Sequence, residues 1–495
     1  MDGYGFNNEL YLEGQIAAIQ ERVAHFGCLY LECGGKLLDD QHAVRVLPGY
    51  DPDTKVQVMQ SLGDNLEVVI CISAHDVEHR KVRGAFGPTY DVFAIDLVNK
   101  LRKLGIYIRH AVITLYQGQP SVAHFRHMLE DIGLQVTLHQ EIPGYPNDID
   151  FVVSPQGMGK NPYIPTTRPI VVITGPGPGS GKLGTCLSQL YHEHQRGKSV
   201  GYAKLESFPV WNLPLNHPLN IAYEAATAEL SDRNMIDPFH LQVYNEACVN
   251  YNRDIAAFPV LRVLLERLTG NPSFYASPTD MGVNRIKDGI VDEKVIHQAC
   301  CQEVAARYFH YKYACHAGYC DEKAVRHIER LLFQLNIRPE IRAVVPAARK
   351  AAQEAKQQRN KGNKGIYCAG ALQLEDGTLI VGKNGPQLHA ASALILNAVK
   401  KLLGLPDEQL LLPQKILQRI SYLKQNIFGD DELSLDLEEM LIALSSASED
   451  YPNVHEAVQC LIHLRGCQVH LTRIPTAGDA IGLRKLGVHT TCDCQ

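Results

Sequence analysis

Several features that mark other classes of protein are missing from this 495-residue sequence. No stretch reaches the roughly 18 unbroken apolar residues of a membrane-spanning helix. The first residues, MDGYGFNNELYLEGQIAAIQERV, carry acids and an amphipathic period where a secretory signal needs a basic start and an apolar run. The formal net charge is -6, without a block of like charge, so we expect no nucleic-acid binding. These absences predict a cytoplasmic protein that binds small molecules, not membranes.

Cysteine is abundant, yet the spacings that characterise disulfide frameworks and zinc sites are absent. Fourteen cysteines are scattered through apolar segments, as at Cys28, Cys71 and Cys186, which favours reduced and buried thiols. Cys492 and Cys494 do not form the paired C-x-x-C spacing of a structural zinc site. We therefore expect no disulfide, no zinc and no other bound metal ligated by these residues.

The length exceeds what one hydrophobic core supports, so about three domains are expected. Buried strands alternate with amphipathic helices in the first 205 residues, which predicts a mostly parallel α/β sheet. The expected strands are 28–33, 67–73, 108–114, 135–138, 170–174 and 199–205. The predicted domains are an N-terminal α/β domain (1–165), a strand-loop-helix-strand unit packed on its sheet (166–218), a helical domain (219–355) and a C-terminal α/β subdomain (356–495), which opens with a hairpin.

The clearest motif is a glycine-rich loop, GPGPGSGK, which runs from Gly175 to Lys182. Several backbone N–H groups can approach one anion only where residues tolerate positive φ and have no bulky side chain. Gly177, Gly179, Ser180 and Gly181 meet this condition. The helix that follows adds the positive end of its dipole, and Lys182 places an ammonium near the outer phosphates. The sequence predicts a P-loop-like phosphate site.

The loop departs from the usual pattern G-x-x-x-x-G-K-[ST] at two positions. Pro176 stands five residues before Gly181, where the pattern has glycine. Leu183 follows the lysine, where the pattern has the hydroxyl that holds Mg²⁺. Ser180 or Thr185 could supply that hydroxyl. The expected cofactor is ATP or another nucleotide with Mg²⁺, and the alternative is a tight packing turn that binds nothing.

The strand after the loop ends in Lys204, and Glu206 follows at the second position beyond it. Carboxyl ends of neighbouring strands converge on the ligand crevice of doubly wound sheets. Lys204 is therefore predicted to help bind the cofactor, and Glu206 to hold a metal or activate a nucleophile. The alternative is an ordinary solvated strand end.

A further set of polar residues lies among prolines and aromatics between residues 211 and 284. Asp237 and Asp254 are candidate catalytic acids, and Arg253 offers a fork for a carboxylate. The alternative for Asp237, which precedes Pro238, is a helix cap. The predicted substrate-binding residues are His240, Asn252, Arg253, Asp280 and Asn284.

Long blocks of the sequence resemble the bacterial family catalogued as domain of unknown function 1846, also called uncharacterised protein family 0371. The blocks are FNNELYL, GGKLLDD, HAVRVLPGYDPD, ITGPGPGSGKLGTCLSQLYHEHQRG, GYAKLESFPVWNLPLNHPLNIAYEAATAEL, MIDPFH, VNYNRD and SPTDMGVN. The resemblance implies a multi-domain α/β protein with a helical insert, a C-terminal subdomain of deaminase-like topology and no assigned activity. Zinc deaminases need H-x-E and a later P-C-x-x-C. The sequence has His389-Ala390-Ala391 instead, so we expect the subdomain to serve oligomer packing or closure of the main site.

Together these features predict a phosphate- or nucleotide-binding protein, namely a metabolic enzyme that acts on a small molecule. The reaction classes expected are phosphotransfer, ligation and hydrolysis, with Lys182, Glu206, Asp237 and Asp254 as catalytic residues. One alternative is a non-catalytic sensor or assembly protein that responds to a phosphorylated ligand, and another is an enzyme that uses a phosphorylated metabolite without a nucleotide. A homo-oligomer is expected in each case.

Overall fold

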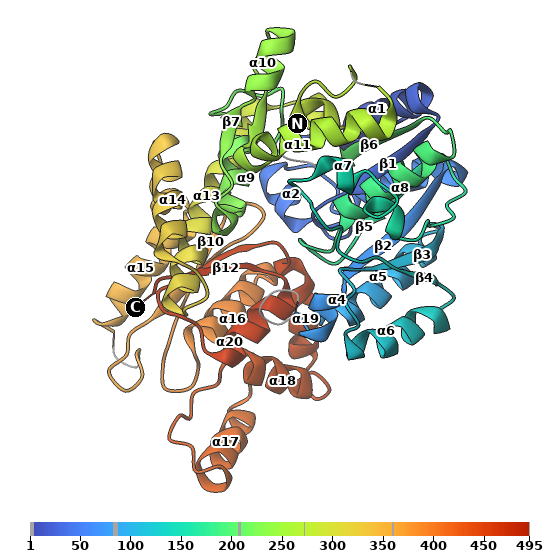
Figure 1. Cartoon of the computed structure of the whole chain (residues 1–495). Helices are drawn as coiled ribbons and strands as arrows, with labels where there is room; N and C mark the ends of the chain where they lie inside the picture. The colour runs from blue at the N-terminus through green and yellow to red at the C-terminus, as the bar shows by residue number, and fades with distance from the viewer. Residues whose placement is uncertain (1–3, 83–87, 206–208, 272, 359–360, 495) are drawn as a thin grey trace. The chain divides into compact units, whose positions relative to one another are not determined.

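A computed structural model describes residues 4–82, 88–205, 209–271, 273–358 and 361–494 of the protein. The chain forms two compact units, residues 1–300 and 301–495, and α13 (Glu293–His316) contains the division between them (Figure 1). The protein is a mixed α/β protein, as predicted. Over the residues described, no helix combines the length and the apolar character that crossing a membrane requires.

The first unit is built on a parallel sheet of six strands. Their order is β4-β3-β2-β5-β1-β6, and every neighbouring pair is parallel. All six strands predicted from the sequence are confirmed, with bounds that differ by at most one residue. The strands are β1 (Cys28–Cys33), β2 (Leu66–Ser73), β3 (Ile108–Thr114), β4 (Gln135–Leu138), β5 (Ile170–Thr174) and β6 (Val200–Leu205).

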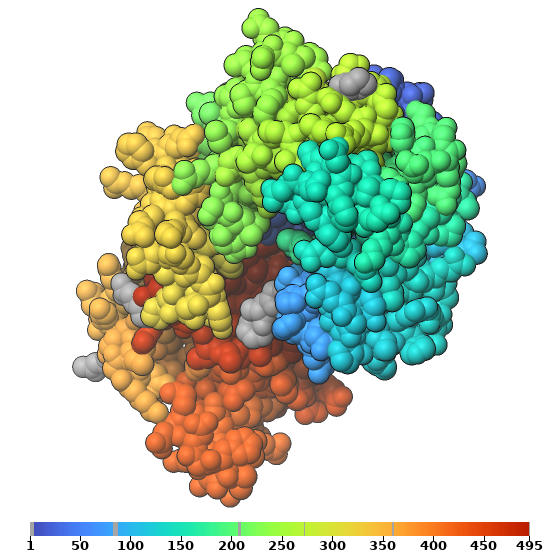
Figure 2. All heavy atoms as spheres, in the orientation of Figure 1, coloured from blue at the N-terminus to red at the C-terminus, as the bar shows by residue number. Residues whose placement is uncertain are grey.

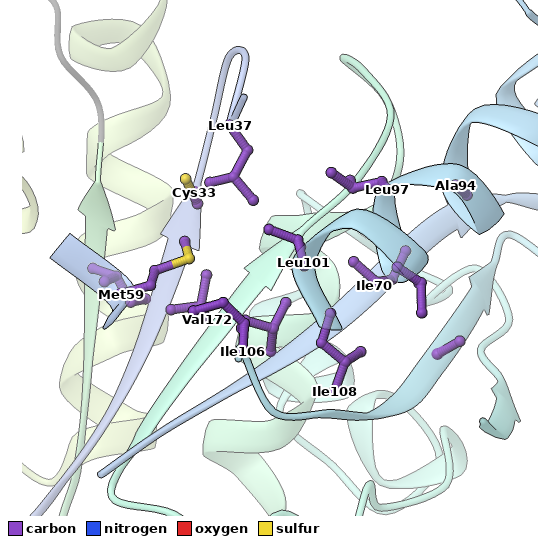
Figure 3. Close-up of a cluster of buried hydrophobic side chains, with 14 of the residues drawn as sticks. Cys33, Leu37, Met59, Ile70, Ala94, Leu97, Leu101, Ile106, Ile108 and Val172 are labelled. Atoms are coloured by element: carbon purple, nitrogen blue, oxygen red, sulfur yellow. The ribbon is translucent and has the colours of Figure 1, made fainter. Parts of the chain in front are cut away.

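Helices cover both faces of this sheet, which explains why its central strands are mostly apolar. Every residue of β2 and of β5 is buried, as parallel sheets require. Figure 3 shows Leu97 and Leu101 of α5 in one buried cluster with Ile70 and Val172 of the sheet. One face carries α1 (Asn8–Phe26), α3 (Thr54–Leu62), α5 (Tyr90–Lys103) and α6 (Pro120–Asp131), and the other carries α8 (Lys182–Gln195) and α11 (Asn252–Thr269).

The strand order reverses in the middle of the sheet. The path from β2 through α5 to β3 runs toward one edge, and the path from β5 through α8 to β6 runs toward the other. β2 and β5 are hydrogen-bonded neighbours. Because the two paths run toward opposite edges and such crossovers are right-handed, the long helices that follow these strands lie on opposite faces of the sheet. The carboxyl ends of these two strands therefore lie at a topological switch point.

Beyond β6 the first unit is mainly helical, as predicted for this stretch. It contains α9 (Pro218–Ala226), α10 (Pro238–Tyr244), α11 and the beginning of α13. A small antiparallel pair, β7 (Asn234–Ile236) and β8 (Val249–Tyr251), was not predicted, because three-residue strands give too short a pattern to detect. Because the pair is antiparallel, α10 and α11 begin at its opposite ends.

The second unit has its own four-stranded sheet, in the order β10-β9-β11-β12. The predicted hairpin is confirmed as β9 (Ala369–Gln373) and β10 (Leu379–Lys383), which pair antiparallel. β11 (Gln468–Leu471) pairs antiparallel with β9 and parallel with β12 (His489–Cys492). β12 was not predicted. The core of this unit includes residues of α16 (Ala390–Leu402), α18 (Leu437–Ala447), α19 (Pro452–Cys460) and α20 (Ala477–Leu486).

The remaining helices of the second unit pack less uniformly. α15 (Val344–Ala355) lies on the sheet through Val344 and Ala348, which contact Ala371 of β9. α14 (Glu322–Gln334) precedes it in the chain. Figure 2 shows the segment around α17 (Gln414–Tyr422) as an orange projection from the surface of this unit. Four apolar side chains there are exposed: Tyr422, Leu423, Ile427 and Phe428.

Candidate functional site

The glycine-rich loop joins β5 to the first turn of α8. Gly181 is the N-cap of α8 with φ 81°, and Gly179 has φ 77°. Both angles lie in the left-handed region, where glycine has no steric cost. Lys182 is the first residue of the helix, so its ammonium and the helix N-terminus act at the same place.

Three of the loop positions are glycine because neighbouring strands and helices leave no room for a side chain. A Cβ at Gly175 would overlap the carbonyl oxygen of Cys71 in β2. One at Gly177 would overlap the ring of Tyr90, and one at Gly181 would overlap Thr114 at the end of β3. The loop therefore lies across the carboxyl ends of β2 and β3. Gly179 differs, because a Cβ there would meet nothing within 4 Å.

Hydrogen bonds hold the loop in a closed curl. The Lys182 ammonium donates to the carbonyl oxygen of Gly177 over 3.1 Å, and the Ser180 hydroxyl donates to the same oxygen over 2.7 Å. The Thr114 hydroxyl donates to the carbonyl oxygen of Ser180 over 2.9 Å. The loop is thus anchored to β3, and the lysine side chain stays within the loop itself.

The two hydroxyls that could replace the one missing at Leu183 are both engaged inside the protein. The Ser180 hydroxyl bonds the loop, as described above. The Thr185 hydroxyl is buried and accepts from the Cys71 thiol over 3.4 Å. Across the parts of the chain that the structure describes, no three His, Cys, Asp or Glu side chains are grouped to hold a metal ion. The loop therefore offers backbone N–H groups and a lysine, but no hydroxyl for Mg²⁺.

A cavity of about 240 Å³ adjoins the loop on the side of β3 and β4. Gly181, Leu183 and Gly184 of the loop and α8 form one wall, and the segment 139–145 forms another. His139 lies in this second wall. Burial lowers the pKa of His139 to about 4, and its Nε2 lies 3.0 Å from the carbonyl oxygen of Pro162. The ring is therefore a neutral donor that fixes the wall.

An acid that sequence reasoning missed, Glu32, stands at the end of β1, next to the loop strand β5. Its carboxylate accepts a hydrogen bond from the Tyr202 hydroxyl over 2.6 Å. Burial raises the pKa of the Cys71 and Cys186 thiols; the charge of Glu32 adds to this rise and Lys182 opposes it. The charges of Glu32 and Lys182 therefore shift the pKa of the same two thiols in opposite directions. The sequence signal for this residue is the apolar run CLYL, which Glu32 follows directly.

The structure brings together two predicted residues that are fifty positions apart. The Lys204 ammonium lies 2.7 Å from a carboxylate oxygen of Asp254, and their side chains are only 15% and 16% exposed. Both line a cavity of about 40 Å³ together with Asn250 and Thr279. This volume has room for only about one to three water molecules, so the ion pair is closely packed. Glu206 lies outside the described residues.

Asp237 fills the hydrogen-bonding capacity of both its oxygens. One accepts from the backbone N–H groups of Phe239 and His240, which caps α10. The other accepts from Asn250 over 3.1 Å and from the Thr279 hydroxyl over 2.9 Å. Asp237 therefore serves as the helix cap that the sequence offered as its alternative role.

The predicted substrate-binding residues are dispersed among structural contacts. His240 Nδ1 lies 2.9 Å from the Ser277 hydroxyl. Asp280 forms a capping box with Ser277, and Asn284 donates to the carbonyl oxygen of Pro209. These three residues lie close to the Asp237 network. Arg253 and Asn252 point elsewhere: Arg253 contacts Asp232 over 3.3 Å, and Asn252 accepts from the backbone of Arg233.

Comparison with known sequences accounts for nearly the whole chain. A family model described as "Domain of unknown function DUF1846, N-terminal" matches residues 4–336, and one described as "Domain of unknown function DUF1846, C-terminal" matches residues 340–495. A UPF0371 protein of Clostridium tetani (strain Massachusetts / E88) is 48% identical over 489 residues, which is 99% of this chain and 97% of the relative. A UPF0371 protein of Clostridium botulinum (strain ATCC 19397 / Type A) is 48% identical over 491 residues, with the same coverage.

Proposed function

This chain belongs to the DUF1846 family, as the sequence blocks predicted, and because that membership brings no activity with it, we propose one from the site. The protein binds a phosphate-bearing small molecule at the loop Gly175–Lys182 and acts on it as an enzyme. The ligand's phosphate group is held by loop N–H groups, the N-terminus of α8 and Lys182.

The observation that carries this proposal is the position of the loop in the sheet. It follows β5 at the point where the strand order reverses between β2 and β5. Ligands of open α/β sheets bind in the crevice outside the carboxyl ends of such strands. A loop that only needed to pack tightly would gain nothing from this position.

The chemistry of the loop supports an anion as ligand. Pro178 and Gly179 are its exposed part, and Gly179 combines a left-handed φ with open space around it. An anion that approached there would meet the helix N-terminus and would compete with the Gly177 carbonyl oxygen for the Lys182 ammonium. The exchange replaces a neutral acceptor with a charged one, which roughly doubles the strength of the hydrogen bond.

The cavity of about 240 Å³ beside Leu183 supports a ligand larger than phosphate alone. It shares Gly181 with the loop, so one molecule can contact both. Its walls are mainly apolar with a few fixed polar groups, such as His139 and Asn161, as is typical of small-molecule sites. We propose this cavity as the place of the rest of the ligand, instead of the predicted polar region between residues 211 and 284. The cavity beside Lys204 and Asp254 in that region is much smaller.

Glu32 supplies the acid that the proposed chemistry needs. At the end of β1, beside the loop strand, it has the place of the acid that holds Mg²⁺ in P-loop nucleotide hydrolases. Lys182 would then neutralise charge on the phosphate, and Glu32 would position a metal ion or the attacking nucleophile. Because Leu183 gives the metal no hydroxyl, we propose a phosphorylated metabolite as the first candidate ligand and a nucleotide with Mg²⁺ as the second.

A non-catalytic phosphate sensor is the alternative, and one observation favours it. The acids proposed as catalytic from the sequence, Asp237 and Asp254, are both engaged by groups of the protein. A sensor needs only a difference in ligand affinity between two conformational states. The two functions differ in turnover, so chemical change of a bound ligand would exclude a purely sensing role.

The test is a thermal-shift screen of nucleoside triphosphates and sugar phosphates, with and without Mg²⁺, followed by mass spectrometry of any stabilising ligand after incubation. We expect stabilisation that Lys182→Ala removes and that the control Lys103→Ala, an exposed lysine at the end of α5, retains. Stabilisation of equal size in Lys182→Ala would place the ligand elsewhere. If a ligand stabilises the protein but stays chemically unchanged after incubation, also when candidate acceptor molecules are added, the sensor would be supported.

A further inference from the structure

The second unit contains a cavity of about 340 Å³ that the proposed function does not use. It lies at the beginnings of α16 and α20, beside the end of β11. Four of its residues carry the chemistry: His389, Asp479, Arg473 and Cys368. Its volume is within the range of small-molecule sites, whose mostly apolar walls carry a few fixed polar groups.

His389 is held by Asp479 in one orientation. Its Nδ1 lies 2.9 Å from a carboxylate oxygen of Asp479. The same oxygen accepts from the Thr476 hydroxyl over 2.9 Å, and the other oxygen accepts from the backbone N–H of Leu437 over 2.9 Å. Asp479 is buried and uses both oxygens inside the protein. It is therefore a positioning residue, and the bond to it raises the pKa of His389.

The second nitrogen of the imidazole has no such partner. Nε2 of His389 makes no hydrogen bond with any residue in the described parts of the chain, and the side chain is 20% exposed. Because Nδ1–H donates to Asp479, a protonated ring carries its second N–H on Nε2. On the protonated ring, this N–H is a donor for a ligand in the cavity that His389 lines.

Among the charged side chains that line the cavity, Arg473 differs from the carboxylates, which are already bound by groups of the protein. Arg473 is exposed and makes no ion pair or hydrogen bond with the residues that the structure describes. Glu432, by contrast, binds Asn363, the Ser434 hydroxyl and Lys364. His389 is also the N-cap residue of α16, and its side chain makes no capping hydrogen bond to the helix. A ligand group that enters this cavity therefore meets donors and no unsatisfied carboxylate.

The sequence spacing at α20 explains how this arrangement is built. Pro475, Thr476 and Asp479 have the spacing of P-C-x-x-C in zinc deaminases, with a hydroxyl and a carboxylate where the two thiolates stand. The carboxylate binds the histidine directly instead of sharing a metal with it. The protein thus has a hydrogen-bonded His–Asp pair here.

We propose that this cavity is a second binding site, for a small molecule that carries an oxyanion, either a carboxylate or a phosphate, and that His389 Nε2 and Arg473 bind that group. The site is independent of the loop in the first unit. The guanidinium of Arg473, the imidazole of His389 and the size of the cavity fit a metabolite with one anionic end and an apolar remainder, which would contact Ile366 and Ile474 in the cavity wall.

The test uses Cys368 as a local reporter in the full-length protein. Cys368 lines the cavity and is half-buried, so bound ligand should slow its alkylation by iodoacetamide, followed for each peptide by mass spectrometry. The probes are inorganic phosphate and succinate, measured separately, which distinguishes the two oxyanions. We expect at least about a threefold slowing by one of them in the wild type and in Lys182→Ala, with Cys315 of α13 as the internal reference.

Two substitutions at one position separate binding from structure. His389→Asn places an amide donor near Asp479 but removes Nε2, and we expect it to weaken binding about tenfold, as loss of a charged hydrogen bond does. His389→Gln reaches the Nε2 position and should retain more affinity. Arg473→Ala should weaken binding by a similar factor, whereas the exposed control Arg419→Ala should not. No protection of Cys368 by either probe, or equal protection in His389→Asn and Arg473→Ala, would overturn the proposal. Loss of protection in Lys182→Ala alone would assign the effect to the loop instead.

Discussion

The ammonium nitrogen of Lys182 lies 3.1 Å from the carbonyl oxygen of Gly177, so the lysine of the glycine-rich loop bonds the loop itself. This contact is half-buried and joins a charge to one neutral acceptor. Lys182→Met should therefore lower the free energy of unfolding by no more than about 1 kcal/mol, as urea unfolding would measure. A much larger loss would mean that the lysine has a structural role, and the binding test would then require Lys182→Arg.

Glu32→Gln should separate ligand binding from turnover. The amide oxygen can still accept from Tyr202, so the fold is retained, but the negative charge beside the loop is lost. We expect ligand affinity to change little and turnover of the ligand found in the screen to fall by about a hundredfold or more. Tyr202→Phe, which removes only the orienting hydrogen bond, should have a smaller effect on turnover. Equal turnover in Glu32→Gln and wild type would remove Glu32 from the mechanism.

Two glycines with the same backbone conformation allow a matched comparison. Gly179 in the loop has φ 77° and Gly197 beyond α8 has φ 74°, and a Cβ added at either position would meet no atom within 4 Å. Alanine at either position should cost about 1 kcal/mol of stability, because left-handed backbone is unfavourable for alanine. Only Gly179→Ala should also reduce ligand-induced stabilisation. If both variants keep full stabilisation, the anion does not approach Gly179.

The ion pair of Lys204 and Asp254 should contribute more to the free energy of unfolding than an exposed ion pair does. Asp254→Ala leaves a mostly buried ammonium without its partner, and we expect a loss of about 2 to 3 kcal/mol in the free energy of unfolding. Lys100→Ala, which removes an ion pair with Asp96 whose two side chains are 58% and 51% exposed, should cost less than about 1 kcal/mol. Urea unfolding of both variants tests this order. A reversed order would contradict the burial that the structure gives to the pair.

Stability should fall as the pH is lowered through the range set by His139. Burial lowers the pKa of His139 from 6.5 to about 4, so below pH 6.5 the unfolded chain binds a proton that the folded protein does not. This group alone should remove about 3 kcal/mol of stability between pH 6.5 and 4. His139→Gln, which can still donate to Pro162, should show a shallower pH dependence in urea unfolding. An unchanged slope would mean that other buried histidines, such as His110, dominate.

The sheet and the loop could be predicted because their signals are local. The strands from β1 to β6 are apolar runs bounded by turns, and the alternation of glycines identifies the loop without any tertiary information. The site residues around them depend on contacts between distant parts of the chain. Lys204 meets Asp254 across fifty residues, and nothing in either local sequence indicates the other.

The second unit shows the same limit. The hairpin β9–β10 was predictable from its Asp376-Gly377 turn, but α20 and β12 were not, because short elements give weak periodicity. The pairing of His389 with Asp479 spans ninety residues. The sequence around His389 therefore shows only that a zinc pattern is lacking, while its hydrogen-bond partner Asp479 lies in a segment without a predicted element.

The pairing of β1 has a consequence for how the protein is made. β1 ends at residue 33, but its two partners in the sheet are β5 and β6, which end at residues 174 and 205. During synthesis from the N-terminus, the first strand must therefore remain without either partner strand until about a third of the chain has emerged from the ribosome. At 5 to 20 residues per second, this delay is roughly 10 to 30 seconds. Its apolar residues are exposed for that time, so chaperone dependence and aggregation during rapid expression should centre on this strand.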